Sequence, residues 1–345
     1  MFLPFHSTHR LPSPVSRSLH LCRALSAALL AWCVCGVAAA VVPSGDRFDL
    51  LQSQDKRVAS VAYRLAVANA SLCKATASPQ LGFVLHGVGQ YGPYDRDAAA
   101  RRFGLGDKVA VMAVISGSPA EKAGMVSGDQ LLAIDGRPLD MPGVGVSLDQ
   151  AAVVRVQSAL INALRHGAIS LTVSSASGEH DVRFAAELGC PSDVQMVTGT
   201  DINAWADGSR VMIGEGLLQH CATDDDLALV IGHEMAHNLL GHRRRLAAEG
   251  ISVSGLLPLG ATASRAVRRT EEEADRFAVT LVTTAHFDVS GVARFIGNLI
   301  GSGAPQGTSH PDLLRRVALL NAAIASTRHI ETLVVVSDGP KGWRL

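Results

Sequence analysis

The motif that most constrains the fold of this chain is a pair of histidines within an apolar segment, LALVIGHEMAHNLLGH. The segment runs from Leu227 to His242 and contains H-E-x-x-H at His233, Glu234 and His237. Residues four apart lie on one face of an α-helix, so both imidazoles can reach a single metal ion. The spacing therefore predicts a helix with a metal-binding face, on which Glu234 is the expected general base.

The sequence also predicts how this helix begins. Thr223 and Asp226 have the spacing of an N-terminal capping pair. Leu227, Val230 and Ile231 supply an apolar face that can pack against the rest of the protein. The helix is therefore expected independently of any metal.

A second segment, RRTEEEADRFAVTLV from Arg268, predicts another helix near whose start lie three consecutive glutamates. A catalytic zinc site requires a third protein ligand besides the two histidines, together with an open coordination position. Glu271, Glu272 and Glu273 are the candidates, and Asp275 follows four residues after the first of them. A run of glutamates is also typical of a solvated helix start, so the residue types alone leave this choice open.

The composition excludes some classes of function. The chain has 345 residues, of which 31 are basic and 31 are acidic. This length suggests about two domains and is sufficient to bury a sizeable core. A net charge of zero argues against a nucleic-acid partner, because neutralising phosphates requires an excess of Lys and Arg. An aromatic content of 4% argues against a surface that stacks on bases.

The first 40 residues have the order of a secretory signal peptide. Residues 1–23 contain three arginines and no acidic residue, and an apolar run from Ala24 to Val42 ends in small residues. We expect cleavage near residues 38–40 and an exported protein, periplasmic or secreted. The alternative is an uncleaved membrane anchor, because about 19 apolar residues can just span a bilayer. Cleavage would change the net charge to 28 − 31 = −3. Elsewhere in the sequence, the apolar segment from Ile251 is too short to span a bilayer and would touch a membrane at most.

Export also changes the interpretation of the cysteines. Three of the six would remain after cleavage, namely Cys73, Cys190 and Cys221, and they would lie in an oxidising compartment. One disulfide and one free thiol is the simplest arrangement. We expect Cys73–Cys190, because these two residues flank a domain whose ends should lie close together, and the other pairings stay open.

The residues before the histidine motif have a different pattern of apolar residues and glycines. The segment from Asp46 to Cys73 predicts an amphipathic helix, and residues 81–188 alternate short β-like runs with glycines around one helix from Leu148. After residue 191 the pattern is helical, following a single β-like run. We therefore expect an α+β fold with a helical segment at 41–78, domains at 79–188 and 191–330, and a C-terminal strand or tail at 331–345.

The string VISGSPAEKAGMVSGDQLLAIDGRPL, from Val114 to Leu139, resembles the central part of a bacterial PDZ domain. Within it, Asp135-Gly136 suits a tight hairpin turn. The resemblance implies a groove that binds an extended peptide by its C-terminus, with the helix after Leu148 as one wall. The loop that would hold the peptide carboxylate is Leu81, Gly82 and Phe83. A spacer domain with an unused groove is the alternative.

The later segments resemble the gluzincin zinc metallopeptidases of the CAAX prenyl protease, HtpX and BepA type. That family pairs H-E-x-x-H with a later E-x-x-x-D helix, here Glu271 to Asp275. The resemblance implies one Zn²⁺ per chain, held by His233, His237 and Glu271. Asp275 would orient a ligand histidine, and the other two glutamates of the run would point elsewhere.

Two further strings extend this resemblance. NAWADGSRVMIGEGLL, from Asn203, is similar to a family segment whose strand borders the cleft and pairs with the substrate backbone. SHPDLLRRVALL is similar to a motif near the family's C-terminus and implies that His310 stabilises the oxyanion or binds zinc as a fourth ligand, supported by Arg316. The implied substrate strand is Val211, Met212, Ile213 and Gly214.

These patterns together predict a PDZ-like, β-rich domain followed by a mostly helical zincin domain with a short edge strand or small sheet. The expected function is that of an exported zinc-dependent metalloendopeptidase acting on protein substrates such as misfolded envelope proteins. The alternative is a latent or inactive peptide-binding or chaperone-like protein with a structural zinc site.

Overall fold

The computed structural model describes residues 44–139, 151–251, 261–301 and 315–326. The expected signal peptide, His310 and the C-terminal strand or tail lie outside the described residues, as does most of the apolar segment after Ile251. Within these described ranges, no helix is both long enough and apolar enough to cross a membrane.

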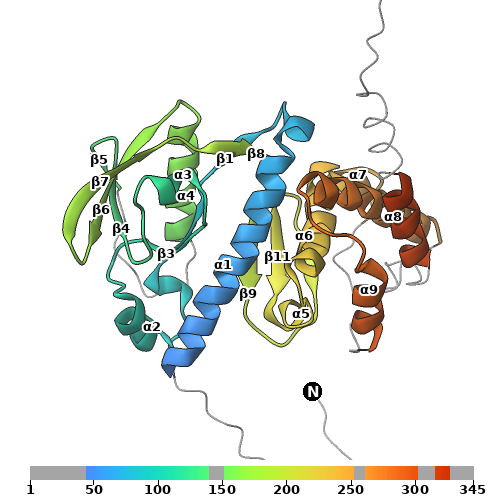
Figure 1. Ribbon diagram of the computed structural model, residues 1–345, viewed down its shortest axis with the longest axis horizontal. Helices are drawn as coiled ribbons and strands as arrows, with labels where there is room; N and C mark the ends of the chain where they lie inside the picture. Colours follow the sequence, from blue (N-terminus) through green and yellow to red (C-terminus); the bar gives the residue numbers. More distant parts are fainter. Residues whose placement is uncertain (1–43, 140–150, 252–260, 302–314, 327–345) are drawn as a thin grey trace, which may run out of the picture. The chain divides into compact units, whose positions relative to one another are not determined.

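The PDZ-like part is an antiparallel sheet with accompanying helices (Figure 1). Its strands, in spatial order, are β2 (Phe83–His86), β3 (Ala110–Val114), β4 (Gln130–Ile134), β6 (Ile169–Ser175) and β7 (Gly178–Phe184), with β5 (Arg137–Pro138) beside β4. Its helices are η2 (Val88–Gln90), α2 (Arg96–Phe103), α3 (Pro119–Lys122) and α4 (Ala151–Leu164). β2 lies at one edge of the sheet and packs against α4, which is the arrangement that a PDZ groove requires.

Two turns in this part depend on backbone conformations that favour glycine. Asp135 and Gly136, which link β4 to β5, have φ values of 50° and 73°. Positive φ at both central residues is what a two-residue hairpin turn needs, so this expectation is confirmed. Gly82 has a φ of 76°, and a Cβ there would lie 2.6 Å from the Cβ of Ser118. The loop before β2 therefore admits no side chain at this position.

The remaining part combines a small sheet with helices, which confirms the expected α+β architecture. The sheet has the order β10 (Ala204–Ala206), β11 (Arg210–Gly214), β9 (Asp193–Val197). The helices are α5 (Glu215–Leu218), α6 (Asp224–Leu239), α7 (His242–Ala248), α8 (Ala261–Thr284) and α9 (Val292–Gly301), and residues 315–326 are also helical. α6 and α8 pack side by side.

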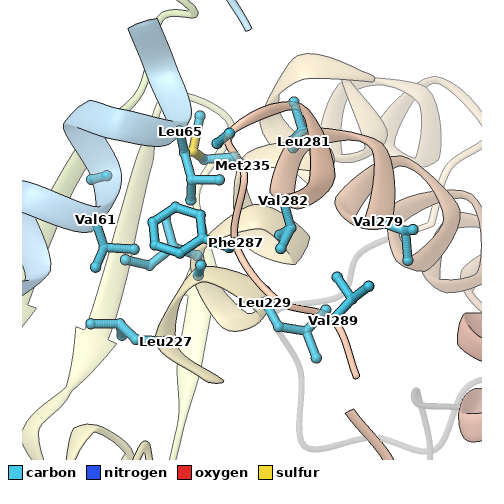
Figure 2. Close-up of a cluster of buried hydrophobic side chains, with 14 of the residues drawn as sticks. Val61, Leu65, Leu227, Leu229, Met235, Val279, Leu281, Val282, Phe287 and Val289 are labelled. Carbon is cyan, nitrogen blue, oxygen red and sulfur yellow. The ribbon is translucent and has the colours of Figure 1, made fainter. Parts of the chain in front are cut away.

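The N-terminal helical segment is α1 (Ser44–Ala68), followed by the short 3-10 helix η1 (Ala70–Cys73). α1 packs against β2 and β3 of the PDZ-like part and also against α6, α8 and β9. Figure 2 shows its buried residues Val61 and Leu65 beside Leu227 and Met235 of α6 and Phe287 beyond α8. α1 is therefore part of the core that supports the histidine helix.

The chain enters and leaves the PDZ-like part at one place. β1 (Ser78–Gln80) and β8 (Glu187–Gly189) pair antiparallel, and the expected domain boundaries at 79 and 188 fall within these strands. Cys73 and Cys190, which flank the two strands, form a disulfide, as expected. Cys221 is a free and buried thiol.

Candidate active site

A capping pair defines where the histidine helix α6 begins, and buried side chains hold it in one orientation about its axis. The Oγ1 of Thr223 accepts a hydrogen bond from the backbone N–H of Asp226, whose carboxylate accepts one from the N–H of Thr223, both at 3.1 Å. This is the capping pair that the sequence predicts. Leu227, Ile231 and Met235 are fully buried on one face of the helix. This anchoring fixes how α6 is rotated about its axis and hence where its histidines point.

His233 and His237 meet Glu271 of α8 at one point. The Nε2 atoms of the two histidines are 3.1 Å apart. The Glu271 carboxylate oxygens lie 3.4 Å from Nε2 of His233 and 3.6 Å from Nε2 of His237. One potential ligand atom from each of the three residues lies within 4.8 Å of the others. The structure therefore brings together the ligand set that the family resemblance implies.

The donor atoms of this cluster fit zinc. Two imidazole nitrogens and one carboxylate are a protein ligand set of catalytic zinc sites. Nδ1 of His233 lies 2.9 Å from Asp275, and Nδ1 of His237 lies 3.1 Å from His242. Because each Nδ1 has another partner, Nε2 of each ring is the atom left for the metal, which is how ligand histidines are usually held.

Asp275 and Arg316 hold His233 in place. Asp275 is buried, and its two oxygens accept hydrogen bonds from Nη2 and Nε of Arg316 at 2.7 and 3.0 Å. Burial would raise the pKa of Asp275, but the hydrogen bond from His233 and the charge of Arg316 outweigh it and lower the pKa to about 2. Asp275 is therefore a fixed negative charge behind the ligand, as the resemblance implies.

The charges around His233 favour a cation at this point. Burial and the charge of Arg316 lower the pKa of His233, but hydrogen bonds to Asp275 and Glu271 outweigh them and raise it to about 10. The carboxylates thus stabilise a positive charge on or beside this ring. A metal ion can supply that charge in place of the proton, because metal and proton compete for the same nitrogen.

Glu234 and Arg316 belong to the same site. Glu234 follows His233 on α6 and is half-buried. Burial lowers the pKa of Arg316, while Asp275, Glu271 and Glu234 raise it, with a net upward shift. Glu234 is thus close enough to act electrostatically on Arg316. Any contact between Arg316 and His310 lies outside the described residues.

The other two glutamates of the run point away from the metal cluster, as expected. Glu272 forms ion pairs with Arg276 at 3.3 Å and with Arg315 at 2.6 Å. Glu273 accepts hydrogen bonds from His242 and Arg245. The contact of Glu273 with His242 was not expected from the sequence. The signal that could have suggested it is that His242 lies only five residues after His237 of the H-E-x-x-H motif.

The small sheet corrects the expectation about the substrate strand. β11, which contains Val211–Gly214, is paired antiparallel to β10 on one side and parallel to β9 on the other. Both edges of β11 are therefore hydrogen-bonded and cannot accept a peptide. β10 and β9 are the edge strands of this sheet. β10 packs against α6, whereas β9 packs against α1. The sequence pattern missed β9 and β10, because only one β-like run was recognised after residue 191.

Comparisons with known proteins agree with this site. Residues 178–262, which contain H-E-x-x-H, match the model of peptidase family M48. This segment is therefore similar to the peptidases of family M48. Residues 111–149 match a PDZ domain model, so the PDZ-like segment precedes the segment that is similar to M48 peptidases. The M48 match ends before Glu271, which is joined to the histidines by the packing of α8 on α6.

One curated relative is a protein of Vibrio cholerae serotype O1 (strain ATCC 39315 / El Tor Inaba N16961) named "Putative beta-barrel assembly-enhancing protease". The chain is 27% identical to it over 150 residues. The match covers 35% of this chain and 31% of that protein, so the chain spans about a third of the length of this relative.

Residues of the expected peptide groove line a cavity of about 590 Å³. Leu81, Gly82 and Phe83 contribute to its wall, together with residues of β2 and α4. Residues of α1 and β9 also line it. The groove between β2 and α4 therefore opens onto α1, which packs against the histidine helix.

Asp55 of α1 lines this cavity and gives a pH-dependent prediction. Burial raises the pKa of Asp55 from 3.8 to about 7. The folded protein therefore binds the carboxyl proton of Asp55 more tightly than the unfolded chain does. The stability that this bound proton contributes is lost as the pH rises towards 7. We expect Asp55→Asn to stabilise the protein at about pH 8, by at most about 4 kcal/mol, and to have little effect near pH 4.

Thermal unfolding of both proteins at the two pH values measures this effect. The control is Asp49→Asn, at an exposed residue of the same helix, which should not stabilise the protein at pH 8. An equal effect of Asp55→Asn at both pH values would contradict the prediction.

Proposed function

We propose that this protein is an exported zinc-dependent endopeptidase that hydrolyses peptide bonds of protein substrates. The convergence of His233, His237 and Glu271, with Glu234 beside them, is the observation that carries this proposal. The disulfide between Cys73 and Cys190 supports an oxidising compartment, periplasmic or extracellular. The PDZ-like domain would bind a peptide segment of a substrate or of a regulatory partner.

Each residue of the site has a defined task in this proposal. His233, His237 and Glu271 would hold the zinc ion, which when bound polarises the scissile carbonyl and lowers the pKa of water. Glu234 takes a proton from the attacking water and delivers it to the leaving amine. Asp275 accepts the Nδ1 proton of His233 and thereby keeps Nε2 directed at the metal position.

The substrate would bind along β10. An extended peptide can add to a free strand edge through backbone hydrogen bonds, and β10 packs against the histidine helix. Recognition through the backbone depends little on the substrate's side chains. We therefore expect broad selectivity for unfolded protein segments, which agrees with misfolded envelope proteins as substrates.

Metal removal tests this proposal. The purified protein is expected to contain about one zinc ion per chain and to cleave a denatured model protein. Treatment with a chelator should abolish cleavage, because the three ligand residues alone cannot polarise the carbonyl, and added zinc should restore it. Zinc content and the appearance of new peptide termini are the measurements.

The same chelator saturated with zinc beforehand is the control. Cleavage that persists in metal-free protein would contradict a zinc peptidase. Stoichiometric zinc without any cleavage would instead indicate a latent or structural zinc protein.

A further inference from the structure

The two histidines of the metal cluster are supported in different ways. Nδ1 of His233 contacts a carboxylate directly, that of Asp275. Nδ1 of His237 lies 3.1 Å from Nδ1 of another imidazole, that of His242. Nε2 of His242 lies 3.3 Å from an oxygen of Glu273. The second histidine therefore also reaches a carboxylate, but through an intervening ring.

An arginine holds the carboxylate in both arrangements. Arg316 donates two hydrogen bonds to Asp275, and Arg245 donates to Glu273 at 2.6 Å. Each histidine of the cluster thus has its own carboxylate–arginine pair.

A change of backbone direction brings His242 to this position. In a continuous helix, residues five apart diverge by about 140° around the axis, so His242 would face away from His237. Gly241 interrupts the helix with a φ of 65°, and α7 begins at the next residue. His242 therefore returns to the side of His237, where it is 1% exposed.

The positions of the protons follow from these contacts. When Nε2 of His237 faces a metal ion, its remaining proton is on Nδ1. This N–H can donate to Nδ1 of His242 only if that nitrogen carries no proton. The proton of His242 is then on Nε2, from which it is donated to Glu273. The three residues thus form a chain in which every donor has an acceptor.

We propose that His242, together with Glu273 and Arg245, is a positioning unit that holds His237 in the orientation required for zinc binding. The proposal rests on the zinc site of the proposed function, and it assigns His242 as a support residue and not as a ligand. Partners of this kind behind a ligand histidine typically change metal affinity by about 10- to 100-fold.

Zinc affinity of substituted proteins, measured by competition with a chromophoric chelator, tests this unit without substrate. His242→Phe keeps a buried ring but removes both nitrogens, and we expect the zinc dissociation constant to rise by about 10- to 100-fold. His242→Asn places an amide oxygen near the position of Nδ1, where it can accept the proton of His237. We therefore expect it to recover most of the lost affinity.

Leu246→Ala is the matched control, because Leu246 is buried on the same helix and has no polar atom in its side chain. It should destabilise the metal-free protein, as seen in thermal unfolding, but leave the zinc dissociation constant nearly unchanged. Circular dichroism of each metal-free variant establishes that it is folded.

Three results would overturn the proposal. His242→Phe that binds zinc as tightly as the wild type would show that the contact has no role in positioning. If Leu246→Ala lost as much zinc affinity as His242→Phe, the loss would be due to general loosening of α7 and not to the removed imidazole. A wild type that binds no zinc would overturn both this proposal and the proposed function. If the wild type binds zinc but cleaves nothing, only the peptidase activity fails.

Discussion

Glu234→Gln is expected to lower the rate of peptide-bond cleavage by about 10²- to 10⁴-fold while leaving zinc binding unchanged. The amide keeps the size of the side chain but cannot accept the proton of the attacking water. The ligand residues His233, His237 and Glu271 are untouched, so the metal cluster stays intact. Steady-state cleavage of a denatured protein and zinc content, measured on the same preparation, separate the two effects.

The control for this substitution is Glu272→Gln on α8. Glu272 is paired with Arg276 and Arg315 outside the metal cluster, so its replacement should leave the cleavage rate within a few-fold of the wild type. A Glu234→Gln protein with wild-type activity would remove this residue from the chemistry. A variant that also loses zinc would show that Glu234 supports the metal site instead.

Removal of the Cys73–Cys190 disulfide is expected to lower the free energy of unfolding by about 2–5 kcal/mol. The two cysteines are 117 residues apart in the sequence, so the cross-link restricts a long segment of the unfolded chain. It also joins the end of the α1–η1 segment to the residues just before β9. The double substitution Cys73→Ala/Cys190→Ala, measured by chemical denaturation under non-reducing conditions, tests this effect.

Reducing agents and the third cysteine provide the controls. Reduction of the wild type should give about the same loss as the double substitution, and the doubly substituted protein should not respond to the reductant. Cys221→Ala should keep the response, because Cys221 is not part of the disulfide. Equal stability of the oxidised and reduced wild type would contradict the prediction.

Local geometry explains which features could be predicted from the sequence. His233 and His237, like Glu271 and Asp275, are four residues apart, and helical periodicity alone places each pair on one face. The capping pair at the start of α6 involves residues three apart. These relations depend on the backbone between neighbouring residues, so one sequence suffices to predict them.

Which strand has a free edge for a substrate is decided by contacts between distant segments of the chain. The pattern around Val211–Gly214 correctly indicated a strand, β11. Whether that strand has a free edge depends on β9 and β10, which come from other segments and cover both of its sides. A strand's own residues do not encode which of its edges will be paired, so the edge at β10 was visible only in the fold.

The sequence by itself thus determined the chemistry of this protein, namely two histidines and a glutamate on a helix, a second acidic helix, and a PDZ-like module before them. Only the tertiary structure decided how that chemistry is held. The packing of α8 on α6 selects Glu271 from three adjacent glutamates, and the turn at Gly241 places His242 behind His237. The physical reason is that helical spacing is set within a few residues, whereas the partner of each ring nitrogen depends on side chains that only packing brings together.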